Sequence, residues 1–412
     1  MVRWAAFLLS GFVVFAACSK SADDGDGAGD PTVDGDASNP SGPKGSSSGG
    51  QTSGSINPSP STPIADGPPR VSYIGRLDLT DKDAPRVAWA GTRIIVRFEG
   101  TALAIDIDEE EINDGGSRYD VALDGKSVNT IALESAGTQT YDIVKDLPAG
   151  THIVTLTRRT EPQVGVSQFK KFAFPNGGKL LAPPVEPARR IEFVGDSEMV
   201  GYGIECENKT DGFSAATENE LLTYPELVAK ELNAEMHNLG YSGKGVYRNG
   251  LPGGDRYPAY YPKAVPRAEA TPWDFGSWKP DVIWVALGAN DYDTGGNDSR
   301  PPPTFDHFKG SYDELLTTIR TKNPEAKIVV VVQSFVNDIY PPGYNGRTNI
   351  KNALQQLVDE HKNAGDANVF LAELPAAMDP DLTGCDSHPN AGLHAKLAPI
   401  AAAKIAEIAG WK

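Results

Sequence analysis

The sequence has 412 residues, of which 39% are hydrophobic and 23% charged, so it is long enough for two or three domains with at least one sizeable core. Its 55 acidic and 38 basic residues give a formal net charge of −17, which argues against binding to nucleic acid, since that needs clustered Lys and Arg. Three cysteines are too few for a disulfide-rich scaffold or a cysteine-rich zinc module, and no run of about 18 apolar residues after the N-terminus predicts a membrane-spanning helix.

Residues 1–18 are expected to be an export signal. A basic start at Arg3 leads into an apolar run that ends in small residues, which is typical of a secretory signal peptide. The end of the run, Phe15-Ala16-Ala17-Cys18, resembles the bacterial lipoprotein box, in which Cys18 would become the lipidated first residue. The alternative is ordinary signal cleavage with a free Cys18. We therefore expect an exported cell-surface or periplasmic lipoprotein that touches the membrane only through its lipid.

Residues 19–69 are expected to form a disordered linker. They are rich in Gly, Ser, Pro and Asp and contain almost no large apolar side chains. Such a segment cannot offset the entropy cost of ordering by burial, so it should act as a flexible tether.

Residues 70–182 show the period-two pattern of strands, interrupted by turn pairs such as Asp124-Gly125. Short strands at near-regular spacing predict a β-sandwich of the jelly-roll type. The expected strands cover residues 93–98, 102–107, 119–123, 151–157 and 169–174.

Residues 188–412 change to alternating strands and helices, after a proline-rich connector at 179–190. This alternation predicts an α/β domain with a doubly wound parallel sheet, in which functional groups lie beyond the carboxyl ends of the strands. Strands are expected at residues 190–194, 281–287, 327–332 and 367–371. Helices are expected after capping boxes at Thr223 and Ser311, and over residues 349–362 and 393–409.

Four polar positions follow strand-like segments of this second part. Ser197, after Gly195-Asp196, is placed to present a nucleophilic hydroxyl, and Gly243 to bring a main-chain N–H close to a developing oxyanion. Asn290 can donate from its carboxamide, and His388 can act as a general base for the serine. Taken singly, each is equally well explained as a turn, a cap or a surface residue.

The order Ser, Gly, Asn, His at strand ends resembles the SGNH (GDSL-type) hydrolases over residues 188–412. The preceding β-rich part, the segment Ser242-Gly-Lys-Gly-Val-Tyr-Arg-Asn249 and the spacing Asp-x-His-Pro resemble carbohydrate esterase family two. This resemblance implies a flavodoxin-like hydrolase domain behind a jelly roll, which removes acetyl groups from polysaccharides such as xylan and mannan. It makes Ser197 the nucleophile, the N–H groups of Ser197 and Gly243 together with Asn290 the oxyanion donors, and His388 the base.

The sequence departs from the common SGNH pattern near His388. The acid three residues before the histidine is replaced by Cys385, and Asp386 lies two residues before it. The imidazole needs an acceptor on its second nitrogen to fix its tautomer. Either Asp386 or a main-chain carbonyl can supply it, so both alternatives stay open.

Cys206 follows Ser197 by nine residues, and Cys385 precedes His388 by three. If both catalytic loops share one rim, the two sulfur atoms are neighbours, and an exported protein can retain a disulfide between them. We therefore expect a Cys206–Cys385 bond.

The partners expected from this interpretation are an acetylated polysaccharide and no nucleic acid, with the chain as a monomer. No cofactor or metal is expected, since no HExxH, P-loop or dinucleotide motif occurs in a fitting context and the acidic run at 291–298 has Pro302 where a calcium loop needs Glu. The acidic run at 106–114 is expected to be a solvated strand end, with a calcium site as the alternative. Two alternatives to a polysaccharide esterase remain. One is an SGNH esterase acting on lipid, thioester or peptidoglycan O-acetyl groups, and the other is a non-catalytic glycan-binding lipoprotein. The aromatic residues Tyr260, Tyr261, Trp273 and Trp278 are expected either to stack on sugar or to pack in the core.

Overall fold

The computed structural model describes residues 57–267, 271–294 and 300–412, and these belong to one compact unit. The predicted signal peptide with Cys18 lies outside the described residues, as does the predicted linker up to residue 56. The last part of that linker is ordered, contrary to the expectation that disorder extends to residue 69. Ala65 N donates to Pro183 O at 2.9 Å and Val185 N to Pro63 O at 2.8 Å, so two main-chain hydrogen bonds fix this segment to the connector.

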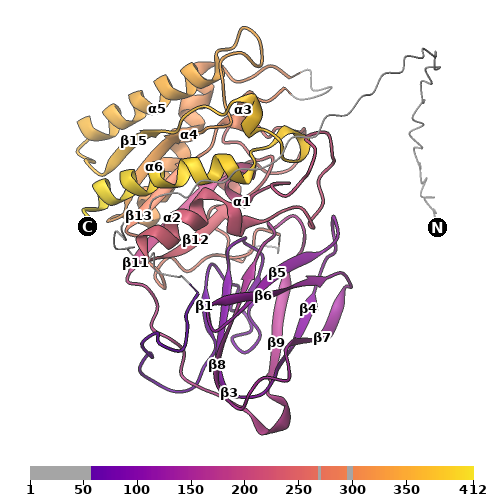
Figure 1. The fold of residues 1–412 in the computed structure, drawn as a ribbon. Coiled ribbons are helices and arrows are strands. Elements are labelled where there is room, and N and C mark those ends of the chain that lie inside the picture. The colour runs from indigo at the N-terminus through magenta and orange to yellow at the C-terminus, as the bar shows by residue number, and fades with distance from the viewer. Residues whose placement is uncertain (1–56, 268–270, 295–299) are drawn as a thin grey trace, which may run out of the picture. The chain divides into compact units, whose positions relative to one another are not determined.

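Two antiparallel sheets form the first part of the fold (Figure 1). One has the order β1-β3-β8-β5-β6, with β10 also paired to β3, and the other has the order β2-β9-β4-β7. Their strands are β1 (Ser72–Ile74), β2 (Arg86–Val87), β3 (Arg93–Gly100), β4 (Leu103–Glu109), β5 (Ser117–Leu123), β6 (Lys126–Leu133), β7 (Gly137–Val144), β8 (Gly150–Arg158), β9 (Ser167–Ala173) and β10 (Lys179–Leu180).

Alternating apolar side chains of these sheets, such as Tyr119 and Val121 in β5, meet in one buried cluster between them. The predicted β-sandwich is confirmed. Strands β6 and β7 had no counterpart among the expected strands, because their side chains are mostly polar and exposed and give little hydrophobic alternation.

A five-stranded parallel sheet organises the second part, with the order β12-β11-β13-β14-β15. This is the flavodoxin-like arrangement, and the predicted doubly wound α/β class is confirmed. The elements are β11 (Arg189–Gly195), α1 (Ser197–Val200), α2 (Tyr224–Leu232), β12 (Ala234–Gly240), β13 (Val282–Ala286), α3 (Ala289–Tyr292), α4 (Phe305–Lys322), β14 (Lys327–Val332), α5 (Gly346–Asn363), β15 (Val369–Glu373) and α6 (Ala391–Ala409).

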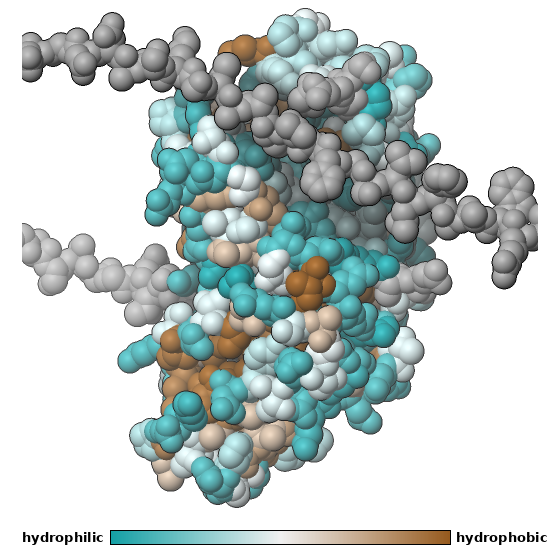
Figure 2. Space-filling view, turned by 90° about the vertical axis from the view of Figure 1, so that its right-hand side faces the viewer, coloured by the Kyte–Doolittle hydropathy of each residue, from teal (hydrophilic) through white to brown (hydrophobic). Residues whose placement is uncertain are grey.

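Helices cover both faces of this sheet (Figure 1). In β14, Ile328 and Val330 face the cluster that contains α4 and α5, whereas Val329 and Val331 face the cluster that contains α2 and α6. A continuous apolar strand is therefore required here, because both of its faces are buried. Hydrophilic side chains predominate on the surface shown in Figure 2, where apolar side chains gather mainly toward the bottom of the view.

Two predicted helix starts need correction. Thr223 does precede α2, but its hydroxyl donates to Glu220 O at 2.7 Å and makes no capping hydrogen bond, so the expected capping box is absent. Helix α4 begins before Ser311, because Thr304 accepts a hydrogen bond from His307 N at 3.3 Å and serves as its N-cap.

Buried charges link the β-sandwich to the parallel sheet. Arg76, after β1, pairs with Glu192 of β11 at 2.9 Å, and both side chains are almost completely buried. Arg93 of β3 likewise pairs with Glu226 of α2. Removing one partner of such a pair leaves a buried charge uncompensated, at a cost of about 3–5 kcal/mol, so each part of the fold depends on the other.

Candidate active site

Ser197 begins α1 at the carboxyl end of β11. The Asp196 side chain accepts a hydrogen bond from Glu198 N at 3.3 Å and caps this single helical turn. A Cβ on Gly195 would lie 3.0 Å from Ala286 O and closer still to the Met199 side chain, so the close packing of β11 against these residues requires glycine at this position. The tight turn places the Ser197 hydroxyl in the cavity beyond the sheet.

His388 lies within hydrogen-bond distance of Ser197, with Nε2 3.0 Å from Oγ. Its Nδ1 is 3.0 Å from the carbonyl oxygen of Cys385. A carbonyl oxygen can only accept, so this second contact requires the proton on Nδ1. Nε2 therefore carries the lone pair and can accept the Ser197 proton.

The surroundings of His388 keep its imidazole neutral. Its ring lies 4.2 Å from the ring of Tyr202 and 5.0 Å from that of Phe335, measured between centroids. Burial lowers the pKa of His388 from 6.5 to about 4, against the opposing effect of the Cys385 carbonyl. An unprotonated base is thus available across the neutral pH range.

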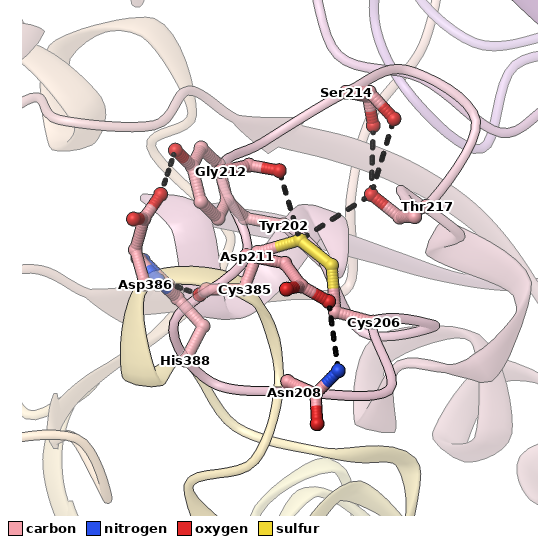
Figure 3. The surroundings of a disulfide bond; sticks show 10 residues. All are labelled: Tyr202, Cys206, Asn208, Asp211, Gly212, Ser214, Thr217, Cys385, Asp386 and His388. Atoms are coloured by element: carbon pink, nitrogen blue, oxygen red, sulfur yellow. Dashed lines mark hydrogen bonds between the residues drawn. A yellow bond between two sulfur atoms is a disulfide. The ribbon is translucent and has the colours of Figure 1, made fainter. Parts of the chain in front are cut away.

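The Asp386 carboxylate makes no hydrogen bond to the His388 ring, which corrects one of the two alternatives for the orienting group. Its carboxylate accepts a hydrogen bond from the Tyr202 hydroxyl at 2.9 Å, and the Cys385 carbonyl takes the position beside Nδ1 (Figure 3). The physical reason is local, since Asp386 and Ser387 both adopt left-handed conformations, with φ of 52° and 61°. This turn brings the carbonyl of Cys385 back toward the histidine.

Cys206 and Cys385 form a disulfide next to this carbonyl (Figure 3). Their Cα atoms are 5.3 Å apart, although 179 positions separate them in the sequence. The bond joins the loop after α1 to the loop that carries His388. It therefore restrains the residue whose carbonyl orients the base.

Gly243 lies on the loop after β12 with φ of +75°, a conformation that favours glycine. Within the described part of the chain, the main-chain N–H groups of Ser197 and Gly243 donate to no protein acceptor. Both residues line the same cavity as His388. The two N–H groups are therefore available to an oxyanion.

Asn290 also lines this cavity, but its carboxamide is already engaged. Nδ2 is 3.1 Å from Asp196 Oδ2 and 3.2 Å from Lys244 O, so its two hydrogens have acceptors in this state. Donation to an oxyanion requires the bond to Lys244 O to give way. Asn290 thus lies at the site, but neither hydrogen of its side-chain amide is free in this state.

Sequence reasoning missed the buried residues that support these groups. Gln333, directly after β14, donates to both carboxylate oxygens of Asp196 at 3.0 and 3.1 Å, and its own oxygen accepts from Ala289 N. Burial raises the pKa of Asp196 to about 6. Asp291 accepts from three main-chain N–H groups of residues 246–248 and fixes the loop that follows Gly243. A polar residue right after an all-apolar strand was the signal for Gln333.

Comparisons with known proteins cover both parts of the chain. Residues 73–184 match the Carbohydrate esterase 2 N-terminal family, and residues 193–396 match the GDSL-like Lipase/Acylhydrolase family. The chain is 30% identical to a solved family two carbohydrate esterase from Clostridium thermocellum in complex with cellohexaose, with a TM-score of 0.75 and coverage of 83% of this chain and 100% of that one. The chain belongs to carbohydrate esterase family two.

Two curated relatives extend the comparison for this family two chain. It is 31% identical over 355 residues to the cellulase/esterase CelE of Acetivibrio thermocellus, covering 85% of this chain but only 41% of that protein's length. It is 26% identical over 355 residues to an acetylxylan esterase / glucomannan deacetylase of Cellvibrio japonicus, covering 84% and 91% of the two chains. The enzyme class expected from the sequence, a carboxylic ester hydrolase, is the class of this family.

The cavity that Ser197 and His388 line in this family two chain has a volume of about 860 Å³. None of the four aromatic residues considered as a sugar-stacking wall lines it; Tyr260, Tyr261 and Trp278 are buried, and Trp278 stacks on His237. The core alternative is therefore correct for these three. Among the aromatic residues that do line the cavity are Tyr202, Tyr241, Tyr292, Phe335 and Tyr340.

In the described ranges, no group of three His, Cys, Asp or Glu side chains is placed to hold a metal ion. Among the helices of the same residues, none has the length and apolar character needed to span a bilayer.

Proposed function

We propose that this chain is a serine esterase that removes O-acetyl groups from a plant-type polysaccharide such as xylan or glucomannan. The observation that carries the proposal is the contact of His388 Nε2 with Ser197 Oγ at 3.0 Å, with the other nitrogen fixed by a carbonyl. An uncharged base beside an alcohol at the floor of an open cavity suits acyl transfer. The named activity of the Cellvibrio japonicus relative supplies the substrate class.

The reaction follows from the positions of the side chains. His388 Nε2 takes the proton as Ser197 Oγ attacks the acetyl carbonyl, and the N–H groups of Ser197 and Gly243 stabilise the oxyanion. Asn290 joins them once its bond to Lys244 O opens. The sugar hydroxyl leaves with the proton from His388, and water then releases acetate from Ser197 by the same steps in reverse.

The test is acetate release from acetylated xylan, acetylated glucomannan and 4-nitrophenyl acetate. We expect Ser197→Ala to abolish turnover, whereas Ser311→Ala, a serine within α4 that does not line the cavity, should leave it nearly unchanged. Binding of polymer without acetate release would support a non-catalytic glycan-binding protein instead. Turnover restricted to lipid or peptidoglycan esters would replace the substrate class and keep the chemistry.

We also propose export as a monomeric lipoprotein anchored through Cys18. The support is the apolar run that ends at Phe15-Ala16-Ala17-Cys18. Expression in a bacterial host with labelled fatty acid should give a lipid-labelled protein, and Cys18→Ala should lose the label. A labelled Cys18→Ala variant would contradict this assignment.

A further inference from the structure

A carboxylate from the β-sandwich reaches the loop that carries Gly243. Glu161 lies between β8 and β9, and its side chain is completely buried. Its Oε2 accepts a hydrogen bond from the main-chain N–H of Ser242 at 2.7 Å. Ser242 is the residue immediately before Gly243, so this contact is one peptide unit away from an expected oxyanion donor.

Further hydrogen bonds fix Glu161 itself. Gln163 Nε2 donates to Glu161 Oε1 at 2.9 Å, and Gln163 also lines the catalytic cavity. The main-chain N–H of Glu161 donates to Glu218 Oε2 at 3.2 Å, and its carbonyl accepts from Arg158 at 3.3 Å. The carboxylate of Glu161 is therefore held by Gln163 of the β-sandwich part and by Ser242 of the α/β part.

Main-chain hydrogen bonds hold the turn around Gly243, since Tyr241 N donates to Gly195 O at 3.1 Å and Lys244 N donates to Tyr241 O at 3.4 Å. A Cβ on Gly243 would find no atom within 4 Å apart from its chain neighbours, so open space lies in the direction that a side chain would take. Beyond Gly243, its carbonyl accepts from Gly250 N at 2.9 Å, and Asp291 ties down residues 246–248. Before Gly243, the Ser242 N–H bond to Glu161 is the side-chain anchor that the β-sandwich supplies.

We propose that Glu161 of the β-sandwich is a positioning residue for the oxyanion site, because it sets the direction of the Ser242–Gly243 peptide. An oxyanion donor works only when its nitrogen lies about 2.7–3.1 Å from the developing charge. Since loss of a whole donor costs about 10²–10³ in turnover, displacing one without removing it should cost about 10–100-fold. This inference rests on the proposed role of Gly243 in ester hydrolysis.

The test compares three variants of Glu161 in the full chain. Glu161→Ala removes the acceptor, Glu161→Asp withdraws it by one methylene group, and Glu161→Gln keeps an oxygen at the same reach. Glu134→Ala is the control, because Glu134 is an exposed carboxylate of the same β-sandwich that pairs with Arg118. The readouts are kcat and KM for 4-nitrophenyl acetate, the inhibition constant of phenylboronic acid, and the melting temperature.

We expect Glu161→Ala to lower kcat about 10–100-fold with KM changed less than about twofold, and to weaken phenylboronic acid by a similar factor, since its serine adduct carries a tetrahedral oxyanion. Glu161→Gln should keep kcat within about fivefold of the original, and Glu161→Asp should fall between. If Glu161→Ala fails to fold, comparing kcat of Glu161→Asp with that of Glu161→Gln still separates the effect of side-chain length from the effect of charge.

Unchanged kcat in folded Glu161→Ala, or equal losses in the Gln and Asp variants with unaltered boronate binding, would overturn the positioning role. If the original chain releases no acetate, the proposed function fails, and boronate affinity across the variants still measures the effect of Glu161 on the loop.

Discussion

Replacing Asp386 with Asn distinguishes a main-chain carbonyl from a carboxylate as the group that orients His388. The His388 Nδ1 proton is accepted by the Cys385 carbonyl at 3.0 Å, and the Asp386 carboxylate instead accepts from the Tyr202 hydroxyl at 2.9 Å. Asparagine at position 386 keeps an oxygen for Tyr202 and removes only the charge. The tautomer of His388 is therefore unaffected by this substitution.

The size of the effect follows from the exposed position of Asp386. Burial lowers the pKa of His388 to about 4, and the negative charge of Asp386 opposes that shift. A charge–charge interaction at an exposed site is worth about 0.2–1 kcal/mol, which corresponds to roughly 1.4- to 5-fold in rate. Where a carboxylate does hold the histidine tautomer, its replacement by Asn lowers turnover by about 10⁴-fold.

The assay is kcat/KM of Asp386→Asn on 4-nitrophenyl acetate at pH 7, with His388→Ala as the variant that should lose all measurable turnover. A loss below about fivefold is expected for Asp386→Asn. A loss of 10³-fold or more, with the melting temperature unchanged, would mean that the carboxylate acts on the imidazole during turnover and that the carbonyl is not the orienting group.

Three further predictions follow from titration and cross-linking. The kcat/KM should stay level between pH 8 and pH 6 and fall near pH 4, where His388 becomes protonated; a midpoint near 6.5 would contradict this. Burial raises the pKa of Glu198 from 4.5 to about 7, so the folded state loses stability relative to the unfolded state as pH rises through this window. In urea unfolding, Glu198→Gln should therefore be more stable than the original by up to about 3 kcal/mol at pH 8 and equal to it at pH 4. A difference that does not change with pH would refute this prediction. Removing the Cys206–Cys385 bond by a double Ser substitution should lower the free energy of unfolding by at most about 5 kcal/mol, and an unchanged urea midpoint would show that the bond does not constrain the chain.

The sequence was most informative where burial imposes a pattern. The run Val282–Ala286 is buried on both faces of the sheet, so its continuous apolar character identified both the strand and the carboxyl end at which Asn290 lies. The turn at Gly195 was equally readable, since the close approach of Met199 and Ala286 tolerates only glycine. Both the apolar strand and the glycine turn can be identified from a few consecutive residues of the sequence.

The partners of the site residues were not predictable in the same way. That Asp386 bonds Tyr202 and leaves Nδ1 to a carbonyl depends on the left-handed turn at 386–387, which Asp and Ser do not specify by themselves. Gln333 and Glu161 come from segments 136 and 36 residues away from Ser197, and nothing in the local pattern indicates what they contact. Tertiary packing alone decides such contacts.

The ion pair between Arg76 and Glu192 bears on how proteins of this kind can be recombined. A chimera that exchanges the β-sandwich for an unrelated module would lack Arg76. The carboxylate of Glu192 would then be buried in the parallel sheet without a cationic partner. The same exchange would take away Arg93 from Glu226. To move this hydrolase domain into another protein, the chain therefore has to be cut before residue 57. The β-sandwich and the α/β domain are then transferred together as one fragment.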